Sequence, residues 1–271
     1  MSTSLPDYAE PPVIEVICGI YFAPLETFKA VHVGNLWDAF KADFPKVEEH
    51  PPVGVAVEQL TPQVMGQAEI QLVDKPPLPR VWFVSDPGNA IIQLQRDALL
   101  HNWRKLTPSD QYPHFRSVMS GFQEHLSRFQ RFVADNDLGN ISPVQFELTY
   151  VNHILPSKLW SKGQPVGQIF PDFAWKKSKE RFLPTYEGIN WRTAFRLPDE
   201  LGRLHVSIQS AMRRSDREPI MNLEMKARGI GSDRSLGAVS GWFDVAHEWI
   251  VRGFADLTSK KAQTDLWGRK Q

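Results

Sequence analysis

The fold is decided by one stretch at the middle of a chain of 271 residues, Gln145-Phe146-Glu147-Leu148-Thr149-Tyr150-Val151-Asn152-His153-Ile154. Apolar and polar side chains alternate here, and β-branched and aromatic residues are frequent, which is typical of a β-strand. Alternation places Phe146, Leu148 and Tyr150 on one buried face. The stretch therefore predicts a strand that begins the second half of the chain.

The same stretch is similar to the start of the chain. Aligning Ile14-Glu15-Val16 with Phe146-Glu147-Leu148 also places Phe22 over Ile154 and Pro24 over Pro156. Further matches, in the same order, are residues 88–95 with 202–209, Ser120-Gly121-Phe122 with Ser240-Gly241-Trp242, and Phe129 with Trp249. They predict an internal duplication in which Phe129 and Trp249 are both buried. The alternative is that two amphipathic halves are alike in pattern alone.

Local patterns predict the elements of each half. The expected strands are 13–22, 81–85, 90–95, 99–106, 145–154, 191–197, 203–209 and 219–227, with weaker signals at 53–60 and 66–73. The expected helices are 28–43, 113–134 and 235–257, and the terminal Trp267 is expected to fold back onto the core.

These elements predict an α+β fold with two halves, residues 1–138 and 139–271, in one compact unit. Each half would contain a strand, hairpins and a long closing helix. Two antiparallel sheets would join at their edges with the long helices on one face, in a pseudo-twofold, saddle-like arrangement. A likeness of shape to the TATA-binding protein carries no functional meaning.

The composition argues against several classes of protein. Thirty-one basic residues balance 31 acidic ones, so the molecule has no overall field that attracts nucleic acid. No apolar run approaches the roughly 20 residues of a membrane helix, and the first residues lack a signal-peptide pattern. The single cysteine, Cys18, lies in an apolar run and is interpreted as a core residue. We therefore expect a soluble cytoplasmic protein.

Catalytic signatures are missing from the sequence. It contains no phosphate-binding glycine loop, no G-x-S-x-G motif, and no pair of histidines at H-x-H or H-x-x-x-H spacing. One cysteine cannot build a thiolate zinc site. No catalytic residue, cofactor or metal ligand is therefore assigned, and a metal site assembled from distant residues remains the alternative.

The most informative feature is a predicted polar face on the second half. Period-two alternation in strands 191–197, 203–209 and 219–227 places charged and amide side chains on one side, which Glu147, Thr149 and His153 would join. The candidate partner- or ligand-binding residues are Arg192, Arg196, His205, Asn222, Glu224 and His153. Glu224 is the expected counter-charge for one arginine, and Glu147 the second choice. The plainer alternative is a face that simply meets water.

Two basic clusters, at 176–181 and 213–217, each include an acidic residue and fall in expected loops. Solvated loop charge explains them better than a nucleic-acid contact. The polar face also carries no aromatic residues on the second-half strands, and single-stranded RNA is usually bound by stacking on aromatics.

Several segments together resemble a known family. They are residues 12–16, 80–83, 92–97, 102–105, 149–153, 248–254 and 266–269. Over nearly its full length the chain resembles a sporadically distributed bacterial family of about this size with no assigned function. Ala98 and Leu99 stand where that family would have a bulkier or basic pair, which weakens a role for this segment. The resemblance implies a soluble bacterial protein from mobile or conflict-related genes, and it supplies no catalytic residues.

Two functions follow as hypotheses. The first is a non-enzymatic binding module for a protein partner, such as the product of a neighbouring gene in a bacterial conflict or defence system. The alternative is an enzyme or sensor for a small anionic ligand such as a nucleotide, using Arg192, Arg196, His205 and His153. Neither hypothesis involves nucleic-acid or membrane binding.

Overall fold

The computed structural model describes residues 4–54, 56–60, 78–161, 164–175 and 181–270. The strands are β1 (Val13–Phe22), β2 (Lys46–His50), β3 (Arg80–Val84), β4 (Ala90–Gln95), β5 (Ala98–Arg104), β6 (Pro143–Ile154), β7 (Asn190–Arg196), β8 (Arg203–Met212) and β9 (Pro219–Gly229). The helices are α1 (Ala30–Asp38), α2 (His114–Asp135), α3 (Val239–Leu257) and α4 (Lys260–Asp265), with short 3₁₀ turns at Val166–Gln168, Pro171–Phe173, Pro198–Glu200 and Leu236–Ala238.

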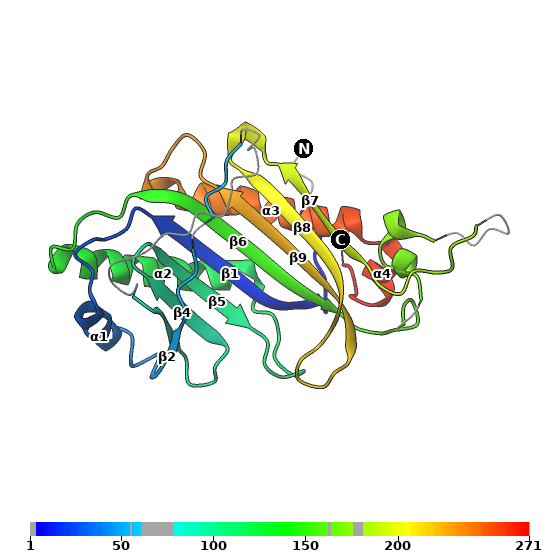
Figure 1. Cartoon of the computed structure of the whole chain (residues 1–271), viewed down its shortest axis with the longest axis horizontal. Coiled ribbons are helices and arrows are strands. Elements are labelled where there is room, and N and C mark those ends of the chain that lie inside the picture. Colours follow the sequence, from blue (N-terminus) through cyan, green and yellow to red (C-terminus); the bar gives the residue numbers. More distant parts are fainter. Residues whose placement is uncertain (1–3, 55, 61–77, 162–163, 176–180, 271) are drawn as a thin grey trace.

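One open antiparallel sheet dominates the described part of the chain (Figure 1). Its nine strands follow the order β2-β3-β4-β5-β1-β6-β9-β8-β7. The predicted fold class is therefore wrong. The prediction is two duplicated halves whose separate sheets join at their edges, with long helices on one face of a saddle. The structure instead is a single sheet-dominated unit. The sequence patterns specify strands locally, and they do not specify which strand edges meet.

The two parts of the chain meet where β1 pairs with β6. Their register matches Val16 with Tyr150, Cys18 with Leu148 and Ile20 with Phe146. The sheet consequently continues without a break across the predicted boundary between residues 138 and 139. Because side chains alternate along both strands, this register puts the apolar residues of β1 and β6 on the same face.

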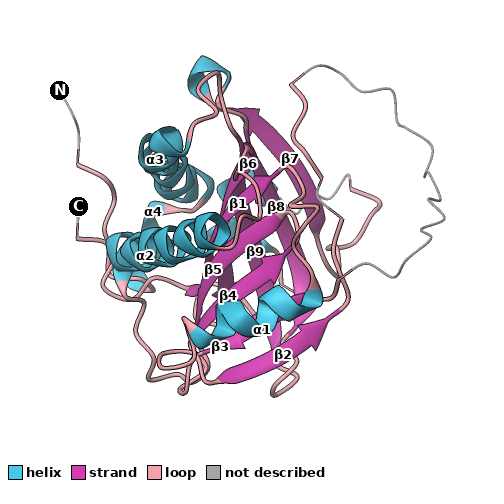
Figure 2. Cartoon of the chain, turned by 90° about the vertical axis from the view of Figure 1, so that its left-hand side faces the viewer, coloured by secondary structure: helices cyan, strands magenta, loops and turns pink. Residues whose placement is uncertain are grey.

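Helices cover that apolar face. Helix α2 packs against β5 and β1, and α3 packs against β6, β8 and β9 (Figure 2). The ring of Phe146 lies 5.6 Å from that of Trp242 and 6.3 Å from that of Phe243, both on α3. The core thus lies between the sheet and these helices, and the next residue of β6, Glu147, points to the opposite face.

Most of the predicted elements are present. The hairpin of β3 and β4, the strands β5 to β9 and the helices α2 and α3 lie within a few residues of their predicted ranges. The expected docking of the C-terminal tail is also confirmed, because Trp267 is buried and Arg269 forms a β-bridge with Tyr8. No helix among the described residues is both long and apolar enough to span a bilayer.

Some local predictions are wrong. The helix expected at 28–43 is limited to α1, and β2, which follows it, was not expected. The described residues of 53–60 form no strand, and the strand expected at 66–73 lies outside the described residues. Trp249 is only partly buried, because Ala246, Ile250 and Phe254 form the inner side of α3 at that level.

Phe129 provides a test of the core. Its side chain is completely buried, and its ring lies 5.8 Å from that of Phe22 on β1. We predict that Phe129→Ala lowers the free energy of unfolding by about 3–5 kcal/mol, because it leaves a cavity. Trp249→Ala, at a partly buried position, should cost about 1–2 kcal/mol. Urea unfolding of both variants measures the difference, and a loss below about 1 kcal/mol for Phe129→Ala would contradict this packing.

Two histidines are buried between β5 and α2. The rings of His101 and His125 lie 4.8 Å apart, and Nδ1 of each is buried with no hydrogen-bond partner among the described residues. Burial lowers the pKa of His101 to about 3, with a smaller contribution from His125, and burial lowers the pKa of His125 to about 4. Both side chains are therefore neutral in the folded protein at pH 7.

This pair predicts an acid-sensitive stability. The folded pKa values lie below the ordinary value of about 6.5, so the unfolded chain binds more protons as the pH falls. The free energy of unfolding should fall below pH 6.5, by up to about 1.4 kcal/mol per pH unit for each histidine until its folded pKa is reached. Replacing His101 by leucine should make this slope shallower in urea titrations between pH 7 and 4.5. An unchanged slope would show that His101 is not responsible.

Candidate functional site

The face of the sheet opposite α2 and α3 is polar. Cross-strand register lines up Arg196, Arg203, Arg228 and Glu147 in one row, and His205, Lys226 and Thr149 in the next. Because side chains two residues apart leave a strand on the same side, all these groups share the polar face.

An extended segment crosses the polar face. We call its described residues, 53–54 and 56–60, the strap. It belongs to none of the strands, and side chains of the sheet hold its backbone. Gln95 accepts from the N–H of Val53 at 2.8 Å and donates to its carbonyl at 3.1 Å. Gln145 accepts from the N–H of Glu58 at 2.6 Å and donates to the carbonyl of Ala56 at 3.2 Å. Each amide thus pairs with both a donor and an acceptor of the strap.

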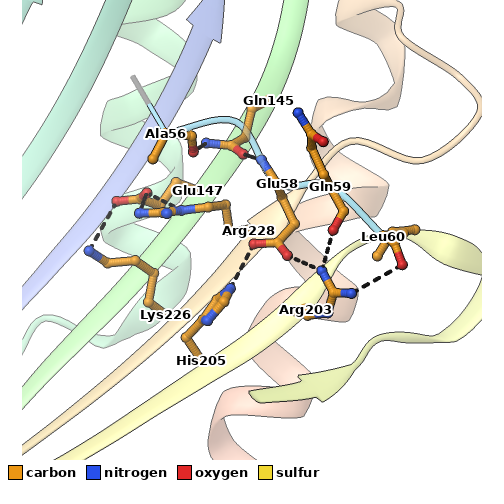
Figure 3. A network of polar contacts seen from close by, with 10 residues as sticks. All are labelled: Ala56, Glu58, Gln59, Leu60, Gln145, Glu147, Arg203, His205, Lys226 and Arg228. Carbon is orange, nitrogen blue, oxygen red and sulfur yellow. Dashed lines mark hydrogen bonds and ion pairs between the residues drawn. The ribbon is translucent and has the colours of Figure 1, made fainter. Parts of the chain in front are cut away.

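Glu58 is the polar anchor of the strap (Figure 3). Its carboxylate accepts a hydrogen bond from Arg203, and its other oxygen lies 2.7 Å from Nε2 of His205. The side chain of Glu58 is only 9% exposed. Arg203 also donates to the carbonyls of Gln59 and Leu60, and Arg196 donates to the carbonyl of Leu60 at 3.1 Å. Residues 58–60 of the strap are therefore held by a charged clamp, formed by Arg196 of β7 and by Arg203 and His205 of β8.

A second carboxylate lies under the strap. Glu147 on β6 is 4% exposed and accepts from Arg228 at 3.0 Å, while the ammonium of Lys226 lies 3.8 Å away. A buried carboxylate of this kind needs such partners, because an unpaired charge in the interior is strongly destabilising. The two carboxylates, one from the strap and one from the sheet, neutralise neighbouring cations on β8 and β9.

Two glycines bring β8 and β9 close at this end. Gly202 and Gly229 have φ values of +133° and +151°, and a Cβ at Gly202 would lie 1.9 Å from the carbonyl oxygen of Arg228. Glycine is therefore required at this contact between the backbone before β8 and the backbone at the end of β9. The contact places Arg203 directly opposite Arg228, so two like charges stand side by side on the polar face. Each arginine has its own carboxylate, Glu58 or Glu147.

The six predicted site residues share the polar face, but only some of them meet. His205 and Arg196 contact the strap. Arg192 faces Gln209, whose amide oxygen in the flipped orientation accepts from it at 3.0 Å. His153 and Asn222 pair on a more distant row, and the amide oxygen of Asn222 is buried without a partner in the described chain. Burial, with a contribution from Arg213, lowers the pKa of His153.

The predicted counter-charge for the arginines is wrong. Glu224 lies 3.5 Å from Lys226 on its own strand, and the described structure contains no ion pair between Glu224 and Arg192 or Arg196. The reason is the order of the strands, since β8 separates β9 from β7. The second choice, Glu147, pairs with Arg228 and Lys226 instead.

Sequence reasoning missed five participants, namely Gln95 and the four residues that follow. Arg203 and Arg228 each lie two residues from a predicted polar position, His205 and Lys226, and therefore share its face; Arg203 is within the predicted strand 203–209, and Arg228 lies one residue beyond the predicted strand 219–227. Gln145 lies two residues before Glu147 and follows the same rule. Glu58 carries no such signal, because it lies in a segment without regular structure that is distant in sequence from its partners.

A small cavity of about 150 Å³ lies between the strap and the sheet. Its charged lining consists of Arg80, Lys226, Arg228 and Glu147, and Tyr21 and three glutamines also border it. Arg80 donates to Gln93 at 3.3 Å, and its Nε atom is buried without a hydrogen-bond partner among the described residues. Burial raises the pKa of Tyr21, with a further contribution from Glu147, so its hydroxyl stays protonated.

The described residues contain no group of three or more His, Cys, Asp or Glu side chains placed to hold a metal ion. Comparisons of the chain with protein-family models, curated proteins and solved structures found no match. The function must therefore be argued from the geometry of the polar face.

Proposed function

We propose that the protein is a non-enzymatic binding module, and that its polar face receives an extended acidic segment of a partner protein. One observation carries the proposal, namely the way in which the face holds the strap. The contacts described above between the sheet and the strap are made by side chains of the sheet, so a segment from another chain with the same groups would be bound in the same way.

The amide contacts suit any extended polypeptide. Gln95 and Gln145 each bind one backbone donor and one backbone acceptor of the strap, and these groups occur in every peptide. This differs from addition of a strand at a sheet edge, where the main chain of the receptor supplies the bonds. The amides therefore position a bound segment without selecting its sequence.

The charged clamp supplies selectivity. Arg203 and His205 enclose the carboxylate of Glu58, and hydrogen bonds to ionised groups are roughly twice as strong as neutral ones. A partner segment with a glutamate or aspartate at this position would satisfy the clamp, whereas a neutral residue would leave Arg203 without its counter-charge. The resemblance to a scattered bacterial family supports a cytoplasmic partner encoded by a neighbouring gene, in a conflict or defence system.

Two substitutions at one ion pair should have opposite effects. We predict that Glu58→Ala raises the affinity of the full-length protein for a fluorescent peptide with the sequence of residues 51–60, because the chain's own strap competes less. Adding Arg203→Ala to that variant should lower the affinity about 10- to 100-fold, the usual cost of removing one partner of a charged hydrogen bond. Fluorescence anisotropy measures both changes.

Arg214→Ala, at an exposed position in the loop between β8 and β9, is the matched control and should leave the peptide affinity unchanged. A peptide with glutamine in place of Glu58 should bind weakly to every variant. If Glu58→Ala and its combination with Arg203→Ala bind the peptide equally, the clamp is only a structural ion pair and the proposal fails.

A second candidate, a sensor of a small anion, is favoured by the cavity under the strap. Three cationic side chains and one carboxylate border it, and one of the cations, Arg80, has a buried donor without a hydrogen-bond partner among the described residues. Guanidinium groups bind phosphate and carboxylate through parallel hydrogen bonds. The volume of about 150 Å³ is suited to a group the size of one phosphate rather than to a whole nucleotide.

Thermal melts in inorganic phosphate test this candidate. Phosphate at about 100 times its Kd should stabilise the wild type by about 2.7 kcal/mol, and Arg80→Gln should remove the effect. An equal stabilisation of both proteins would rule out the cavity as the phosphate site. Peptide binding that fails while phosphate binding succeeds would favour the sensor over the partner-binding module.

A further inference from the structure

A larger cavity lies on the other face of the sheet. Its volume is about 550 Å³, within the usual range for a small-molecule site. The N-terminal segment, the start of α2, strands β6 and β9, and the inner side of α3 form its walls. Tyr150 and Asn152 of β6 reach it from the face that also carries Phe146, so the sheet separates this cavity from the strap.

The walls of this cavity are mostly apolar. Tyr8, Ile250 and Phe254 border it and are at most 7% exposed. Phe115 and His247 are stacked face to face, with ring centroids 4.0 Å apart and an interplanar angle of 6°. Such a chamber suits the flat or aliphatic body of a small molecule, because apolar surface gains from leaving water.

Two tyrosines offer a hydrogen-bond donor inside the cavity. The hydroxyls of Tyr112 and Tyr150 lie 2.8 Å apart, and that bond uses one of their two hydrogens. No acceptor within the described chain is hydrogen-bonded to the second. Burial raises the pKa of both hydroxyls, so the hydrogens are retained at neutral pH. Burial also lowers the pKa of His247 to about 4, so its ring is neutral at pH 7.

The border of the cavity also carries a positive charge. Arg116 on the first turn of α2 is exposed, and the described chain provides no carboxylate within ion-pair distance. Asp7, the acidic residue on the same border, lies 3.3 Å from the ammonium of Lys270. A negatively charged hydrogen-bond acceptor on a bound molecule would therefore interact both with the free tyrosine hydroxyl hydrogen and with Arg116.

We propose that this cavity binds a small, largely apolar carboxylate, with its body beside the stacked Phe115–His247 pair and the apolar residues of α3, and its acidic end at the Tyr112–Tyr150 pair. This site is independent of the strap, because the two lie on opposite faces of the sheet. A molecule bound in this cavity would contact the core-facing sides of β6 and α3.

A fluorescent aromatic anion, 1-anilinonaphthalene-8-sulfonate, serves as the probe, and indole-3-acetate serves as the competing carboxylate. The wild type should bind one equivalent of the probe, and indole-3-acetate should displace it. Val251→Trp, which fills the cavity from α3, should weaken probe binding at least tenfold. Val31→Trp, at a 63% exposed position on α1, is the matched control and should bind like the wild type.

A second variant keeps the test decisive if Val251→Trp does not fold. The double variant Tyr112→Phe plus Tyr150→Phe retains both rings and removes both hydroxyls, and it should weaken binding of the displacing carboxylate about three- to tenfold, the usual range for one lost hydrogen bond. Indole-3-acetamide should compete less well than indole-3-acetate. The proposal is overturned by probe binding that is unaffected by Val251→Trp or that falls equally in Val31→Trp, and by an indole-3-acetate affinity that is unchanged in the double tyrosine variant.

Discussion

The antiparallel pairing of β1 with β6 is the contact on which the rest of the sheet depends, because the two parts of the chain meet there. Its register decides which side chains face α2 and α3 and which face the strap. A shift by one residue would carry Phe146 to the polar face and Glu147 into the core, with an unpaired charge. The apolar face of these strands and the buried Glu147 therefore specify the same register.

The polar face has an electrostatic requirement that the sheet alone does not meet. Arg203 and Arg228 stand opposite each other, and Glu147 neutralises only the latter. Glu58 of the strap neutralises the former. A polypeptide that replaces the strap must therefore bring a carboxylate of its own, which is why we assign acidic chemistry to the partner. The backbone contacts of Gln95 and Gln145 add affinity without adding selectivity.

Part of this arrangement could be predicted from sequence. Alternation within β6, β7, β8 and β9 identified the polar face that carries Arg196 and His205, because a period of two needs only local information. The strand order could not be predicted in the same way. Glu224 was assigned to the wrong cations because nothing in the pattern shows that β8 lies between β9 and β7. Glu58 was missed because a segment held by distant side chains leaves no periodic signal.

The position of β1 between β5 and β6 also determines the order in which its two edges can pair while the chain is being synthesised. β1 can pair with β5 once Arg104 has been made and has left the ribosome, but its other edge must wait for β6, which ends at Ile154. At about 5–20 residues per second, translation of the intervening stretch takes on the order of seconds. Helix α2 is made during this interval and can cover the face of β1 but not its edge. A nascent chain therefore exposes the unpaired backbone N–H and C=O groups along one edge of β1, which makes contact between nascent chains on neighbouring ribosomes of one message a hazard for this fold.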